Sequence, residues 1–178
     1  MTEQRHLHLI PFAQAVFSRS IGMINQAAEG LTDEDLFHQP TPESNSIGWL
    51  AWHLSRRKDY YTGKLTAESE VWTSNSWAEK FTMDYVTTGL GHSAEEVSQF
   101  CPSRALLMGY VQAAREESLA RLSRITEVML MSDVTLDANR GIRPATDVFN
   151  PMISDCLQHT GQIAYIRGML TGRGWFSI

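Results

Sequence analysis

One stretch near the C-terminal end, residues 148–170, constrains the fold of this chain most. Seven of its residues recur at steps of three or four, as on one face of a helix: Val148, Met152, Asp155, His159, Gln162, Ile166 and Met169. The face begins and ends with apolar residues, so the periodicity predicts that it is buried. Its middle nevertheless carries a carboxylate, an imidazole and an amide. A buried ionisable group is costly unless it is paired, hydrogen-bonded or bound to a metal.

Asp155 and His159 are one helical turn apart, and this spacing has two interpretations. The two side chains can satisfy each other inside a core, as many i,i+4 pairs do. They can also hold one ion between them, because a carboxylate and an imidazole are both common metal ligands. The spacing alone leaves both open. Cys156 points about 100° away from Asp155 on an ideal helix, so we expect it to pack in the core rather than bind a metal.

Three further stretches have the apolar periodicity of long helices. We expect helices from about Leu7 to Ala28, from Asn45 or Ser46 to about Leu65, and from Ser103 to about Met131. The C-terminal helix should begin at a cap on Thr146 or Asp147 and end at Gly172. Four amphipathic helices without a repeat of strands predict an all-α fold, with residues 1–178 forming one four-helix bundle. Bundles build their sites in the core, from side chains on facing helices.

The connection between the second and third of these helices is long and rich in aromatic residues. Residues 67–102 include Trp72, Trp77, Phe81 and Tyr85, and we expect mainly a loop there. Residues 93–96 have the form of a capping box and predict a short helix to about residue 99. A long aromatic loop in a compact domain usually has a function or forms an interface. We expect His92 to be a loop or capping residue.

Composition excludes several classes of function. The 20 acidic residues outnumber the 15 basic ones, which argues against nucleic acid as the main partner. Residues 56–58, the one basic run, are expected to be a solvated helix face, as are most charged residues of the third helix, Arg121 and Arg124 among them. No apolar run approaches the roughly 20 residues that span a bilayer, so no membrane is expected. Two cysteines suggest a reducing, cytoplasmic location.

Two segments resemble the DinB/YfiT-like superfamily: GWLAWHL at residues 48–54 and QHTGQIAYIRG at residues 158–168. That group includes the N-terminal domain of mycothiol-dependent maleylpyruvate isomerase and related bacterial thiol S-transferases. Residues 31–36 and 172–175 support the resemblance, which covers nearly the whole chain. It implies a four-helix bundle with a divalent metal held by three histidines. His53 and His159 match two of those positions, and Asp155 occupies the third.

The resemblance also implies a chemistry for this site. Two imidazoles and a carboxylate suit zinc, iron, nickel or manganese. A three-ligand metal keeps open positions, where a low-molecular-weight thiol can bind as a thiolate and attack a small electrophile. Gln162 lies one turn beyond His159. It is a candidate catalytic residue that hydrogen-bonds a ligand or orients His159, or else a satisfied core amide. We expect a structural ion pair for Arg167.

Three classes of function fit these observations. The first is a metal-dependent thiol S-transferase or detoxification enzyme acting on a small molecule. The second is a metal-dependent hydrolase that activates water. The third is a non-enzymatic, stress-associated module for metal binding or dimerisation. We also expect a homodimer, because of the aromatic loop, the apolar tail at Trp175 and Phe176, and the resemblance itself.

Overall fold

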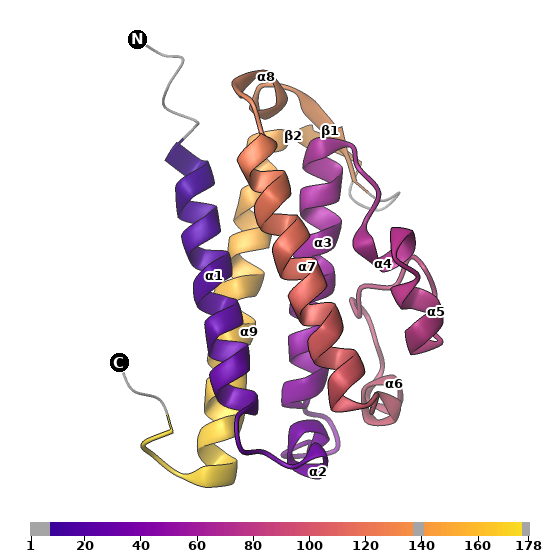
Figure 1. Ribbon diagram of the computed structural model, residues 1–178, viewed down its shortest axis with the longest axis vertical. Helices are drawn as coiled ribbons and strands as arrows, with labels where there is room; N and C mark the ends of the chain where they lie inside the picture. The colour runs from indigo at the N-terminus through magenta and orange to yellow at the C-terminus, as the bar shows by residue number, and fades with distance from the viewer. Residues whose placement is uncertain (1–7, 137–140, 176–178) are drawn as a thin grey trace.

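The computed structural model describes residues 8–136 and 141–175. Four long helices form a bundle: α1 (Leu9–Ala28), α3 (Ile47–Thr66), α7 (Arg104–Arg124) and α9 (Ala145–Thr171). α1 and α9 run in one direction, and α3 and α7 run in the other (Figure 1). α3 packs against α7 on one side and α9 on the other, while α1 contacts α9 and α7. The predicted all-α fold is confirmed.

Short elements connect the long helices. They are α2 (Asp33–Phe37), α4 (Val71–Ser74), α5 (Trp77–Phe81), α6 (Ala94–Gln99) and α8 (Glu127–Leu130). Two strands, β1 (Asp133–Thr135) and β2 (Ile142–Pro144), pair antiparallel, with Val134 opposite Arg143. This hairpin lies beside α8 at one end of the bundle (Figure 1). Among the described residues, no helix has the length and apolar character needed to cross a bilayer.

Side-chain caps begin most of the helices that the sequence predicted. The hydroxyl of Ser46 accepts a hydrogen bond from the backbone N–H of Trp49 at the start of α3. Ser103 caps α7 in the same way. Ser93 and Glu96 form a complete capping box at α6. Each cap provides an acceptor for an N–H of the first turn, which has no partner within the helix.

Two helix boundaries differ from the prediction. The third long helix ends at Arg124 rather than near Met131, because the hydroxyl of Thr126 caps a separate helix, α8. The last helix begins at Ala145, before the predicted caps, and its start has no side-chain cap. Instead, the backbone N–H of Ala145 donates to the carbonyl of Ser132, which ties the helix start to the hairpin. Leu7, the predicted start of the first helix, lies outside the described residues.

The expectation of a solvated basic run on the second helix is wrong. Arg56, Arg57 and Lys58 are 0%, 5% and 1% exposed, and Arg121 of α7 is 2% exposed. Almost every residue of α3 is buried, because other elements cover all of its sides. The segment from α4 to α6 packs beside α3 (Figure 1) and covers Arg56, which contacts Glu70. Arg57 instead contacts Asp155 on α9, and Lys58 contacts Ser20 on α1.

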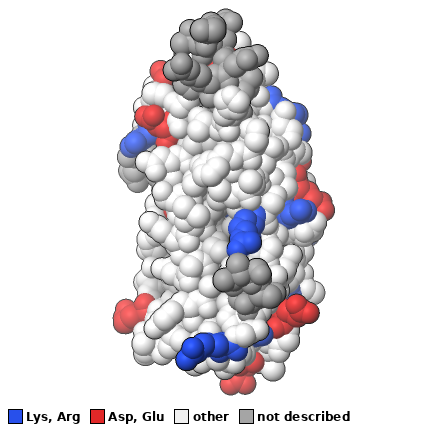
Figure 2. Space-filling view, turned by 90° about the vertical axis from the view of Figure 1, so that its left-hand side faces the viewer, with Lys and Arg blue, Asp and Glu red and all other residues white. Residues whose placement is uncertain are grey.

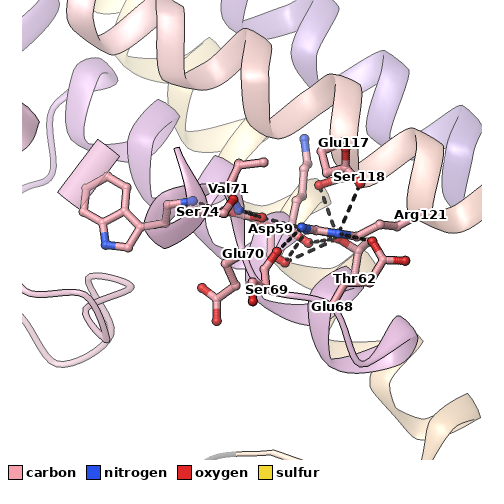
Figure 3. Close-up of polar contacts among 12 residues, drawn as sticks. Asp59, Thr62, Glu68, Ser69, Glu70, Val71, Ser74, Glu117, Ser118 and Arg121 are labelled. Atoms are coloured by element: carbon pink, nitrogen blue, oxygen red, sulfur yellow. Dashed lines mark hydrogen bonds and ion pairs between the residues drawn. The ribbon is translucent and has the colours of Figure 1, made fainter. Parts of the chain in front are cut away.

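A buried ion-pair network fixes that covering segment in place (Figure 3). The carboxylate of Asp59 on α3 accepts hydrogen bonds from the backbone N–H groups of Val71 and Trp72, at 3.0 and 2.9 Å. It also pairs with the guanidinium of Arg121 on α7, at 2.8 Å. Arg56 pairs with Glu70 at 2.8 Å. Two long helices and the start of the covering segment are thus joined through charges that all have partners.

Candidate functional site

Two histidines from different helices meet at the seam between α3 and α9. The ring centroids of His53 and His159 are 4.9 Å apart, and the rings lie edge to face at 81°. His53 is 5% exposed, while His159 is half-buried. The structure therefore brings together two of the three residues that the sequence singled out as metal ligands.

Each of these rings is held by an oxygen acceptor at Nδ1. The Nδ1 of His53 contacts the backbone carbonyl of Thr88, and the Nδ1 of His159 lies 2.7 Å from the amide oxygen of Gln162. A carbonyl oxygen can only accept, so Nδ1 carries the proton in both rings. In the neutral form of each ring, Nε2 is then left with a free lone pair. This is the tautomer of a metal-binding histidine whose other nitrogen donates to an oriented acceptor.

Burial keeps His53 neutral. Removal from solvent is the main cause that lowers the pKa of the His53 imidazole to about 3; nearby His159, Arg57 and His92 contribute in the same direction, and the hydrogen bond to Thr88 opposes them. A charged imidazole would need water or a counter-ion that this position does not provide. His53 is therefore a neutral nitrogen donor at physiological pH.

Asp155 is engaged by an arginine. Its Oδ2 accepts a hydrogen bond from Nε of Arg57 at 2.8 Å, and the two side chains are 18% and 6% exposed. Within residues 8–136 and 141–175, no group of three or more His, Cys, Asp or Glu side chains is arranged to hold a metal. The two imidazoles fit a metal, whereas the carboxylate would have to be shared between the metal and Arg57, which already holds Oδ2. Metal binding by His53, Asp155 and His159 stays a prediction.

The buried helix face predicted for residues 148–169 is correct only in part. Val148, Met152 and Ile166 are buried, but Gln162 and Met169 are exposed. The far end of this face borders a cavity of about 470 Å³ between α9 and the segment before α3. Its lining includes Pro40, Thr41, Leu50, Gln162, Tyr165 and Met169. Gln162 is therefore not a core amide; it contacts His159 and also lines this cavity.

Sequence reasoning missed the loop that closes over His53. Trp49 stacks on the His53 ring, with centroids 4.8 Å apart and an angle of 9°. Gly89 has a φ of +83°, and a Cβ there would lie 2.7–2.9 Å from ring atoms of Trp52, His53 and Trp49. Only glycine allows this approach without strain. The sequence signal for this close approach was the presence of two glycines, Gly89 and Gly91, inside an aromatic-rich loop.

His92 belongs to the same assembly. It lies in the loop, as expected, but its ring stacks on Trp52 at 5.7 Å. Its Nδ1 accepts from the indole N–H of Trp49 at 3.3 Å, and its Nε2 lies 3.1 Å from the hydroxyl of Thr87. These contacts fix the loop at Thr87. The backbone carbonyl of the following residue, Thr88, orients His53. The buried network at Asp59 and this aromatic cluster together position the α3 half of the site.

Comparison with known proteins was made for both sequence and structure. The sequence profile of the DinB superfamily matches residues 17–163. The chain belongs to the DinB superfamily. A crystal structure of a conserved protein from Enterococcus faecalis has a similar fold, with a TM-score of 0.79 and 23% sequence identity over 92% of this chain and 97% of that one. Comparison with curated proteins gives no match.

Two other residues of this DinB-superfamily chain had expected roles. Cys156 is buried, as predicted, and burial raises the pKa of its thiol. Arg167 is buried but does not form the expected ion pair among the described residues. Its Nη2 donates to the backbone carbonyl of Glu29 at 2.9 Å. Arg167 therefore joins α9 to the end of α1 through a main-chain contact.

Proposed function

We propose that this DinB-superfamily protein is a metal-dependent enzyme that transfers a low-molecular-weight thiol to a small electrophilic molecule. The observation that supports it most is the pair His53 and His159. Two imidazoles from facing helices lie 4.9 Å apart, and each has its Nδ1 hydrogen-bonded to an oxygen acceptor. In the neutral form of each ring, Nε2 is the nitrogen left to bind a metal.

The donor set suits a divalent ion such as zinc, nickel, iron or manganese. His53 and His159 would hold it through Nε2, and Asp155 would add a carboxylate whose Oδ2 is in contact with Arg57. When bound, such an ion lowers the pKa of a coordinated thiol, so that the thiolate is available as a nucleophile at neutral pH.

The protein's own residues contribute orientation and shielding. Thr88 and Gln162 fix the tautomers of the two histidines, and Trp49 covers one face of His53. Gln162 also lines the cavity of about 470 Å³, together with Leu50, Tyr165 and Met169. We propose this partly apolar cavity as the place where the small electrophile enters. Gln162 then has a hydrogen-bonding role between the cavity and His159.

Thiol-dependent turnover tests this proposal. Metal-loaded protein is incubated with 1-chloro-2,4-dinitrobenzene and with cysteine, glutathione or mycothiol, and loss of thiol is followed. We expect turnover that needs both the metal and a thiol. His159→Ala should lower it by about 100-fold or more, as expected for the loss of a metal ligand. Turnover of esters or amides without thiol would instead indicate a hydrolase. No turnover in either assay would indicate a non-enzymatic module.

We also propose a cytoplasmic location. Cys101 and Cys156 are both free thiols, one exposed and one buried. Free cysteines are typical of reducing compartments. Fractionation of cells that express the protein, followed by detection of the chain, tests this location; recovery from an oxidising compartment would contradict it.

A further inference from the structure

We propose that Arg57 competes with a metal ion for the carboxylate of Asp155, and thereby determines which ions the two-histidine site takes. This inference rests on the proposed metal site. It concerns a residue that the sequence placed on a solvated face, and which the structure instead buries beside His53 and Asp155.

Three contacts with two residues, Asp155 and Tyr61, fix the guanidinium of Arg57. Its Nε donates to Oδ2 of Asp155 at 2.8 Å, and its Nη2 donates to the hydroxyl of Tyr61. Its central carbon lies 4.6 Å from the centroid of the Tyr61 ring. The residue is 5% exposed, so its charge is poorly screened by water. A cation held in this way repels a second cation that approaches the same carboxylate.

The ion pair also decides which donors the site offers. While Asp155 is bound to Arg57, the site presents two imidazole nitrogens. Nitrogen donors favour zinc and nickel, whereas manganese prefers carboxylate and other oxygen donors. A metal that recruits Asp155 must bind beside the buried guanidinium, which repels it and already holds Oδ2, or displace that guanidinium and leave a buried charge without its partner. Arg57 therefore weakens binding of every divalent ion and weakens manganese binding more than zinc binding.

Metal titration of the full chain tests this competition without an activity assay. The metal-free parent and the Arg57→Gln variant are titrated with zinc chloride and with manganese chloride by calorimetry. We expect Arg57→Gln to bind zinc at least about tenfold more tightly than the parent, and manganese by a larger factor, by analogy with the 10- to 100-fold effects of residues that contact metal ligands. An ordinary structural role for Arg57 would give the opposite result, weaker binding.

A double-mutant cycle identifies the cause. Asp155→Asn should bind both ions more weakly than the parent, and Arg57→Gln combined with Asp155→Asn should lose the gain, because no carboxylate remains to be released. Arg104→Gln is the matched control. It also removes an arginine from an arginine–aspartate pair, with Asp33 at 3.0 Å between α7 and α2, and should leave both affinities unchanged.

Three results would overturn the inference. Unchanged or weaker metal binding in Arg57→Gln contradicts the competition. The proposed metal site itself still stands in that case, provided that the parent binds metal. A gain that persists in the double variant shows that charge alone, not Asp155, is responsible. Absence of binding in all variants removes the metal site itself. If Arg57→Gln does not fold, nitrogen-15 NMR of the parent gives the answer. The Arg57 Nε–H signal must shift on zinc addition if Asp155 leaves it, and an unmoved signal overturns the proposal.

Discussion

Gly89 is the residue at which the loop approaches the histidine site most closely. A Cβ there would meet three rings at 2.7–2.9 Å, in a backbone with φ of +83°. We expect Gly89→Ala to lower the free energy of unfolding by about 2–4 kcal/mol, from backbone strain and overpacking together. Gly91→Ala is the control, since Gly91 has a φ of +85° and no atom within 4 Å of an added Cβ. It should lose only about 1–2 kcal/mol. Equal losses in urea denaturation would show that the ring contacts are unimportant.

Lys58 gives the fold a pH dependence. Burial lowers the pKa of its ammonium group from 10.5 to about 8, against an opposing effect of Cys156. Below about pH 8 the folded protein holds a buried charge, and its cost is relieved as the pH rises towards 10.5, where the unfolded chain also loses the proton. Lys58→Met should therefore stabilise the protein at pH 7, by up to about 3 kcal/mol.

The comparison with the parent at two pH values checks this prediction. The advantage of Lys58→Met should shrink between pH 7 and pH 10, as measured by urea denaturation of both proteins. Both proteins carry Cys156→Ala, because the thiol of Cys156 is coupled to Lys58 and would titrate differently in the variant. An advantage that is the same at both pH values would show that Lys58 is not a charge buried at a cost.

At the scale of single residues, the sequence predicted part of the candidate site. Helical periodicity and the resemblance together singled out His53 and His159, and the structure brings these two side chains together. The partner of Asp155 could not be predicted, because Arg57 is far from it in sequence and lay in a run that periodicity assigned to solvent. Thr88 could not be predicted either, since its role is that of a backbone carbonyl, which any residue provides.

At the scale of elements, the connection from α4 to α6 depends on Asp59. Its buried carboxylate holds the start of α4 and the guanidinium of Arg121 (Figure 3). Asp59→Asn keeps the shape but removes the shortest and most buried ion pair of Arg121, leaving only its pairs with Glu68 and Glu117 at 3.5 Å. We expect a loss of about 3–5 kcal/mol in the free energy of unfolding.

Asp33→Asn is the control for that measurement. Asp33 pairs with Arg104 at 3.0 Å, but its side chain is 63% exposed, so the substitution should cost about 0–1 kcal/mol. If urea denaturation gave similar losses of unfolding free energy for Asp33→Asn and Asp59→Asn, the connection from α4 to α6 would not depend on Asp59.

The four long helices were predictable because each has its own periodicity, and two of them also have a local cap, Ser46 for α3 and Ser103 for α7. The capping box that begins with Ser93 likewise predicted the short helix α6. The break after Arg124 was missed, because the apolar stripe continues through it and only the cap at Thr126 interrupts the helix. The burial of α3 on all sides was missed for a different reason. It results from packing against α1, α7, α9 and the segment from α4 to α6 together, and the periodicity of one helix carries no information on those contacts.

On the scale of the whole molecule, the face formed by α1 and α9 carries few charges (Figure 2). α1 has one charged residue, Arg19, and α9 has Asp147, Asp155 and Arg167. Exposed apolar side chains occur on both helices: Phe12, Leu157, Tyr165 and Met169. Such a face is typical of an interface. We propose that a second copy of the chain covers it. Trp175 is half-buried against the core, and Phe176 lies outside the described residues.

Light scattering across a concentration series tests this homodimer. We expect a dimer for the parent and a monomer for Leu157→Glu, because Leu157 is 64% exposed on α9 and a carboxylate there would lose its hydration on association. Val128→Glu is the control, since Val128 is 75% exposed on α8. A monomeric parent at high concentration, or a Leu157→Glu variant that stays dimeric, would contradict the proposed interface.

The metal content of the protein tests the central claim most directly. The chain is produced without a histidine tag, and elemental analysis is performed on the parent and on His159→Ala. Loss of one of two converging imidazoles should abolish tight binding. We predict about one divalent ion per chain in the parent and close to none in the variant. An equal metal load in the two proteins would contradict a site built on His53 and His159.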